Sequence, residues 1–381
     1  EHYIFPESEY ITSCIKITQV NAQILNKLYD RQPDSNILPL LQKFVLQLLE
    51  WRTQLPSFLQ VDFNKTPFAI SRLCTNVFTE YFQGLNLAIR PLLYHFTALL
   101  LRNRSAASSK TTSLPSYINL QKYSKTISIL LNCSLQASIN TIKSLWVMFE
   151  HNNLALFGYM DREYLFNSSC TLILFSDTFG LHEQINPYIN QSLRVFTKMR
   201  NLGNKPAGLR RAQLLKLMND LDIHGVMQDL INKHYDNLQA DKNFDKSYGP
   251  ELKIVSVPRT SEKNDFQKTS ILDNNTLPLA QEFLPSNHLL GLSTNMSSLR
   301  STAGSTRSNK SSIPNDSPDS FSTKTELSEN IMEKNVDRLL SNRIENTNEV
   351  EKFFQEIDDW SVQDNQLWKD ISDQAMWLGI N

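Results

Sequence analysis

Apolar residues recur at spacings of three and four through the first 245 residues of this chain, and this periodicity restricts what the chain can fold into. Between residues 9 and 28, for example, Tyr10, Cys14, Ile17, Ile24 and Leu28 fall on one face of a helix. Glycine is scarce, with 10 residues in 381, which argues against Gly-rich phosphate loops and tight β-hairpins. The sequence therefore predicts an all-α, multi-helix domain over residues 1–245.

Prolines and polar stretches predict where these helices begin and end. Thr66 is a plausible helix cap and Pro67 suits a first helical position, whereas Pro91 inside the same helix predicts a kink or a break. The Ser/Thr-rich residues 102–116 are expected to form a surface loop. The apolar run at residues 172–175 could pass for a strand, but the length of its segment favours a helix. Helices are predicted at residues 9–28, 39–54, 66–101, 117–149 and 161–179.

The composition changes after residue 245. Residues 246–345 are rich in Ser, Thr and Asn, with fifteen Ser or Thr among the thirty-two residues from Leu292 to Thr323. A segment with so few large apolar groups cannot bury enough surface to offset the entropy of ordering, so we expect a disordered linker. Ser317, which precedes a proline, is a candidate phosphorylation site in this linker, and a plain solvated spacer is the alternative.

The last segment, residues 346–381, combines acidic and aromatic residues. From Glu351 to Leu378 seven acidic groups stand against two lysines, a net charge of −5. Acidic groups keep bulky side chains solvated until a partner offers a groove, which is typical of an activation segment that binds coactivators. The alternative is that the segment docks on the helical domain as its last helix, and masking by such docking would be an off state. The predicted coactivator-binding side chains are Phe353, Phe354, Ile357, Trp360, Leu367, Trp368, Ile371 and Trp377.

Charge and motifs argue against several classes of function. The net charge is −1, so we expect no direct binding of nucleic acid by this chain. The four cysteines stand alone, and no metal-ligand spacing, P-loop, GxGxxG or GxSxG motif occurs. We therefore predict no metal site, no cofactor and no enzymatic activity. Glu1 looks like a cut end without the features of a secretory signal, and Arg90 and His95 interrupt the best candidate membrane span, so no membrane association is expected.

Three polar residues in the most apolar stretch are candidates for lining a small-molecule site: Arg90, Tyr94 and His95. Arginine can hold a ligand carboxylate with two hydrogen bonds. A structural role is the alternative, with Arg90 in an ion pair or at a helix end and His95 as a satisfied core histidine.

Several motifs resemble the regulatory domain of fungal zinc-cluster transcription factors, in the order that family has them. Residues 48–59, LLEWRTQLPSFL, are similar to the family's L-x-x-W-x-x-x-L-P-x-x-L segment. Residues 81–93, YFQGLNLAIRPLL, are similar to its Y…I-x-L-x-R-P-x-L helix, with Arg90 and Pro91 at the matching positions. Residues 157–174 and 199–221 resemble its D-x-x-Y-x-F-x-S-A helix and its M…G-N…A closing helices. The resemblance covers roughly residues 5–235.

This resemblance implies a nuclear transcriptional activator of RNA polymerase II genes, similar to the yeast regulators of nutrient utilisation. The helical domain, truncated at its N-terminal side, would respond to a small-molecule effector, and the tail would recruit coactivator complexes. The family's six-cysteine zinc cluster is missing from this sequence, so zinc and DNA binding are expected only in a missing N-terminal domain, which could also form a homodimer. The alternative function is a helical scaffold or adaptor with an acidic partner-binding tail, and a motif-free helical enzyme is a weaker one.

Overall fold

The computed structural model describes residues 7–29, 37–108, 117–222, 225–235, 330–340, 367, 370 and 371. Contacts divide the chain into two units, Glu1–His234 with Ser317–Asn381, and Tyr235–Asp316. Within the described ranges the elements are helices and no strand occurs, which confirms the all-α prediction. The helices are α1 (Glu7–Leu28), α2 (Leu38–Thr53), α3 (Arg72–Ser108), α4 (Lys125–Glu150), α5 (Tyr159–Phe179), α6 (His182–Asn201), α7 (Lys205–Leu221) and α8 (Gln228–Tyr235), with the short 3₁₀ helices η1 (Ser57–Leu59) and η2 (Leu120–Lys122).

Local sequence signals account for several helix ends. The side chain of Ser124 accepts a hydrogen bond from the backbone N–H of Ile127 and caps α4. Asn204 caps α7 in the same way, through the N–H of Ala207. At the other end of α5, Gly180 adopts the left-handed conformation, with φ of 82°. Each of these groups satisfies backbone donors or acceptors that a helix leaves unpaired at its ends.

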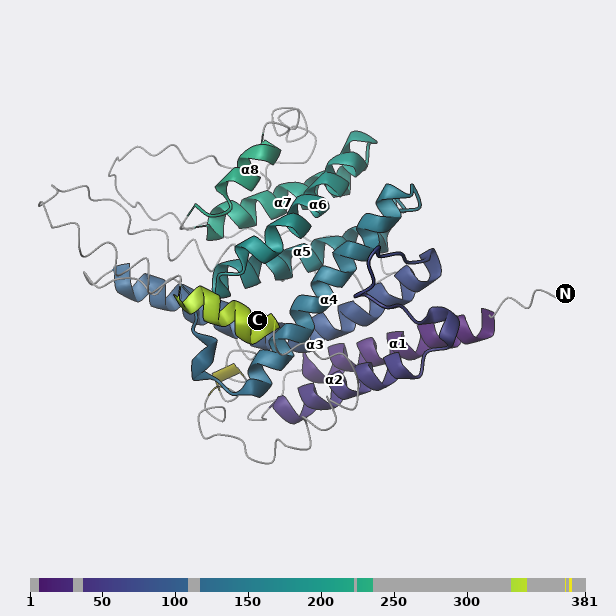
Figure 1. Ribbon diagram of the computed structural model, residues 1–381, viewed down its shortest axis with the longest axis horizontal. Helices are drawn as coiled ribbons and strands as arrows, with labels where there is room; N and C mark the ends of the chain where they lie inside the picture. The colour runs from purple at the N-terminus through teal and green to yellow at the C-terminus, as the bar shows by residue number, and fades with distance from the viewer. Residues whose placement is uncertain are drawn as a thin grey trace, which may run out of the picture. The chain divides into compact units, whose positions relative to one another are not determined.

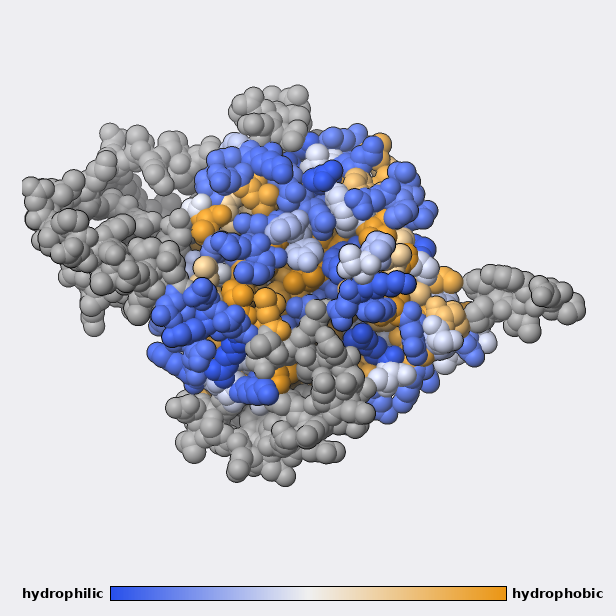
Figure 2. All heavy atoms as spheres, viewed as in Figure 1, coloured by the Kyte–Doolittle hydropathy of each residue, from blue (hydrophilic) through white to orange (hydrophobic). Residues whose placement is uncertain are grey.

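The long helix α3 lies at the centre of the described helices (Figure 1) and packs against α1, α2, α4 and α5. By length and composition alone α3 could cross a membrane, but 72% of its most apolar stretch is buried inside the protein. A core helix of a folded domain meets the same criteria. The visible face is mostly hydrophilic, and hydrophobic residues show between the helices (Figure 2), as amphipathic helices with buried apolar faces require.

The structure corrects the predicted limits of α3. The helix begins at Arg72 rather than at Thr66, continues through Pro91 without a break and ends at Ser108. Residues 102–108 are therefore helical, although a loop was predicted there. The reason is a contact distant in sequence: Arg104 donates hydrogen bonds of 2.9 and 3.0 Å to the carboxylate of Asp177 on α5, and both side chains are buried. This buried ion pair holds the polar end of α3 against the domain.

The other predicted helices agree with the structure to within two residues at their ends, except that the helix predicted from residue 117 begins at Lys125. The apolar run at residues 172–175 lies inside α5, so the helical interpretation was right. The predicted central helix over residues 117–149 is α4, preceded by an extended segment and η2. Trp51 and Leu55 are core residues. Trp51 stacks on Tyr81, with ring centroids 5.5 Å apart, and donates a hydrogen bond to the backbone oxygen of Ser13.

His234, near the end of α8, makes the stability of the domain sensitive to mild acid. Burial, reinforced by the charges of Arg211, Lys233 and Arg194, lowers the pKa of His234 to about 4. The unfolded chain has an ordinary histidine pKa of about 6.5. The unfolded state therefore binds more protons than the folded state between these two values, and stability falls as the pH decreases through that window.

We expect the free energy of unfolding to decrease from pH 7 to pH 5, and His234→Gln to flatten this dependence. Urea denaturation at a series of pH values measures the free energy of unfolding of the parent chain and of the variant. Equal slopes for the parent chain and the variant would mean that other groups cause the acid sensitivity.

Candidate functional site: the docking surface for the C-terminal segment

Residues 330–340 form a helix, which we call the docking helix, that packs on the domain although it follows residue 235 by almost a hundred positions. This helix lies inside the stretch 246–345 that was predicted to be a disordered linker, so that prediction is wrong for these residues. Figure 1 shows the docking helix in yellow-green, against the start of α4 and the end of α5. It belongs to the same compact unit as the helical domain.

Asn335 is the centre of this contact. Its side chain is fully buried. The side-chain oxygen accepts a hydrogen bond of 3.0 Å from the N–H of Leu120, and the side-chain nitrogen donates to the backbone oxygens of Ile118 (2.8 Å) and Phe179 (3.1 Å). A buried amide with three partners is well satisfied. Asn335 thus recognises the backbone of the segment that enters α4 and of the end of α5.

Further contacts flank Asn335 along the docking helix. Leu339 has no exposed surface, and Arg338 donates hydrogen bonds to the hydroxyl of Ser128, at 2.8 Å, and to the backbone oxygen of Tyr123. Gly180 permits the close approach of the helix, since a Cβ atom there would lie 2.9 Å from the Cγ atom of Met332. The positive φ of Gly180 also favours glycine at this position. We call the surface formed by residues 117–128 and 179–180 the docking surface.

Two of the predicted coactivator-binding residues are described, and both are buried. Leu367 is 5% exposed and Ile371 is 1% exposed, and the helical positions described at 367, 370 and 371 place them one turn apart on the same face. Both lie in the same compact unit as the helical domain. Leu367 and Ile371 are therefore buried within this unit, and the two interpretations of the tail stay predictions. The predicted phosphorylation site Ser317 lies outside the described residues. So do the other six predicted coactivator-binding residues, which are Phe353, Phe354, Ile357, Trp360, Trp368 and Trp377.

Of the three predicted ligand-binding residues on α3, Arg90 and His95 are buried and Tyr94 is half-buried. Arg90 is buried close to Tyr94 and Tyr29, and its charge opposes the rise in their pKa values that burial causes. His95 is buried against Phe96, with ring centroids 5.7 Å apart, which fits the core histidine interpretation. The ion pair proposed for Arg90 is not among those between described residues. None of the three residues lines the cavity described next.

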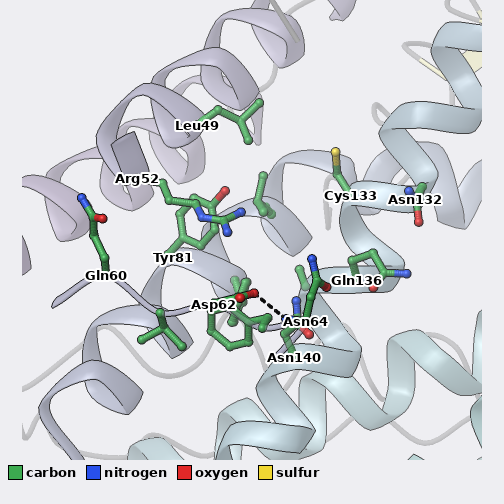
Figure 3. Close-up of a pocket in the computed structure, with 15 residues that line it drawn as sticks. Leu49, Arg52, Gln60, Asp62, Asn64, Tyr81, Asn132, Cys133, Gln136 and Asn140 are labelled. Atoms are coloured by element: carbon green, nitrogen blue, oxygen red, sulfur yellow. Dashed lines mark hydrogen bonds between the residues drawn. The ribbon is translucent and has the colours of Figure 1, made fainter. Parts of the chain in front are cut away.

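A cavity of about 520 Å³ opens between α2, α3, α4 and the loop that follows η1 (Figure 3). Its polar lining includes Arg52 from α2, Asp62 from the loop, Tyr81 from α3 and Gln136 and Asn140 from α4. Sequence reasoning assigned no role to the polar residues of this group. Their signal was weak, because they come from four separate elements and each has an unremarkable local sequence. The apolar lining consists of Leu49, Val61, Phe63, Phe82, Leu85 and Ala137.

Comparisons with models of known families, with curated proteins and with solved structures return no match. The resemblance to zinc-cluster regulators therefore stays a prediction. In the described part of the chain, no group of three His, Cys, Asp or Glu side chains is placed to hold a metal ion.

Proposed function

We propose that this chain is the regulatory and activating part of a nuclear transcriptional regulator, whose helical domain holds its own acidic C-terminal segment until that segment is needed. The observation that carries this proposal is the burial of Leu367 and Ile371, two positions at which the sequence predicts contact with a coactivator. A side chain cannot fill a coactivator groove while it is buried within its own chain. Recruitment of a coactivator therefore requires the segment to leave the domain.

The chemistry of the segment supports this function. The net charge of −5 between Glu351 and Leu378, interleaved with aromatic residues, suits a segment that stays soluble when released and offers anchors to a hydrophobic groove. The docking helix supplies a second attachment close in sequence, centred on Asn335. Two attachments separated by fewer than forty residues reinforce each other, because formation of one keeps the other close to its surface.

The test compares two fusions to an unrelated DNA-binding domain in a reporter assay. Residues 346–381 alone should activate the reporter strongly, and residues 1–381 should activate it less, because docking competes with coactivator binding. Alanine at Phe353, Phe354, Trp360 and Trp368 should abolish activation by the short fusion, since each anchor lost at a hot spot costs at least about 2 kcal/mol.

The matched control is Asp358→Asn in the short fusion, where the loss of one exposed charge changes the binding energy by at most about 1 kcal/mol. A silent short fusion, together with unfolding of the domain when residues 346–381 are deleted, would contradict the proposal. That result would favour the alternative, a helical scaffold in which the C-terminal segment is a structural helix.

A further inference from the structure

We infer that the cavity between α2, α3, α4 and the loop after η1 is a binding site for a small metabolite that carries a single carboxylate, held by Arg52. The volume of about 520 Å³ falls within the range of roughly 300 to 1,000 Å³ that small-molecule sites occupy. Such sites combine apolar walls with a few convergent polar groups. The lining described above has this composition.

Arg52 provides the positive charge of the site. Its side chain reaches from the last turn of α2 beside Tyr81, toward the part of the loop that carries Asp62 and Asn64 (Figure 3). None of the ion pairs between described residues includes Arg52. The last turn of a helix favours a cation, which accounts for the arginine there but leaves its charge available. A carboxylate is the group that a guanidinium binds best, through two parallel hydrogen bonds.

Two groups of the cavity wall that feel the charge of Arg52, Tyr81 and Cys133, do not neutralise it. Burial raises the pKa of the Tyr81 hydroxyl to about 12 and that of the Cys133 thiol to about 12, with Arg52 opposing both shifts. Both groups are therefore uncharged near neutral pH. A ligand carboxylate can therefore pair with the charge of Arg52 without displacing a carboxylate of the protein.

Asp62 restricts the ligand to one negative charge. It lines the same cavity as Arg52, and its Oδ1 atom accepts a hydrogen bond of 2.8 Å from the N–H of Asn64. One cation and one anion in the lining disfavour polyanions such as citrate or phosphate esters, because a second negative charge would approach Asp62. The amides of Gln136 and Asn140 add donors and acceptors for a neutral or cationic polar body. The ligand class is therefore a polar monocarboxylate, amino acids included.

The loop that closes the cavity is held in place before a ligand arrives. Phe63 is buried, and its ring centroid lies 5.0 Å from that of Phe78 and 5.1 Å from that of Phe82. Lys143 on α4 donates a hydrogen bond of 2.9 Å to the backbone oxygen of Phe63, and Gln60 donates to that of Leu55. A site that is already ordered loses little conformational entropy on binding.

The test measures the melting temperature of the full 381-residue chain with a panel of compounds, and it does not depend on transcriptional activity. The monocarboxylate probes are glycolate, lactate and the standard amino acids other than aspartate and glutamate, and the polyanions are citrate and inorganic phosphate. Each is added at about 10 mM, above the roughly 1 µM to 1 mM range of typical Michaelis constants. At least one monocarboxylate should raise the melting temperature by about 5 °C, and the amide of the same compound should not.

Two variants separate the site from general effects on the protein. Arg52→Gln should weaken binding of that monocarboxylate about 30-fold or more in calorimetry, while the variant alone keeps a cooperative melting transition. Arg102→Gln, at an exposed arginine of α3, is the matched control and should bind as the parent chain does. The inference is overturned if no monocarboxylate raises the melting temperature, if citrate or phosphate stabilises the chain equally, or if Arg52→Gln binds with unchanged affinity.

Discussion

Replacing Asn335 with leucine should release the docking helix and raise the reporter activity of the fusion of residues 1–381 toward that of the isolated tail. Leucine fills a similar volume but leaves the N–H of Leu120 and the backbone oxygens of Ile118 and Phe179 without their partner. Three lost hydrogen bonds at about 1 kcal/mol each weaken docking by about 3 kcal/mol, which is more than a hundredfold in the docking equilibrium.

Hydrogen exchange provides a direct measurement of this release, because the N–H of Leu120 donates to Asn335 itself. That amide should exchange much faster in Asn335→Leu than in the parent chain. Asn330→Leu is the matched control, since Asn330 is an exposed asparagine of the same helix and its replacement should change neither exchange nor reporter activity. Unchanged protection of Leu120 in Asn335→Leu would show that Asn335 does not hold the helix.

Arg104→Met should destabilise the domain by about 3 to 5 kcal/mol, because it leaves the carboxylate of Asp177 buried without its arginine. The side chains of Arg104 and Asp177 are only 6% and 3% exposed, so water cannot replace the lost partner without local unfolding. Urea denaturation monitored by circular dichroism measures the change in the free energy of unfolding.

Two further variants identify the cause of this loss. Arg104→Met combined with Asp177→Asn removes the buried charge and should be more stable than Arg104→Met alone, which a double-mutant cycle quantifies. Arg102→Met, two positions away and exposed, should change stability by no more than about 0.5 kcal/mol. A double variant no more stable than the single one would assign the loss to packing rather than to the buried charge of Asp177.

Prediction from the sequence succeeded where local pattern determines structure. The apolar face of α1 and the buried run in α5 follow from helical spacing. It failed at both ends of α3. The polar residues after Leu101 look like a loop until Arg104 is known to meet Asp177 on another helix. Thr66 and Pro67 look like a helix start, but the loop before α3 is fixed by the burial of Phe63 and by Lys143.

The docking helix was missed although its sequence carries a signal. Apolar residues recur with helical spacing through it, in a region whose overall composition is polar. A composition averaged over a hundred residues does not reveal one short amphipathic helix. The role of Asn335 could not be predicted at all, because its three partners are backbone groups 156 to 217 positions away in sequence. The spaced apolar residues are Ile331, Met332, Val336, Leu339 and Leu340.

The hydrogen bonds of Asn335 leave the docking helix less free to change in sequence than the surface that it contacts. The docking helix contributes a specific side chain, whereas the domain contributes main-chain groups that almost any amino acid would supply. Substitutions at Ile118 or Leu120 that preserve the backbone path would leave these acceptors and this donor in place. Single substitutions that sever the contact therefore include changes of Asn335, changes at Gly180, where the positive φ favours glycine, and Leu120→Pro, which removes the donating N–H.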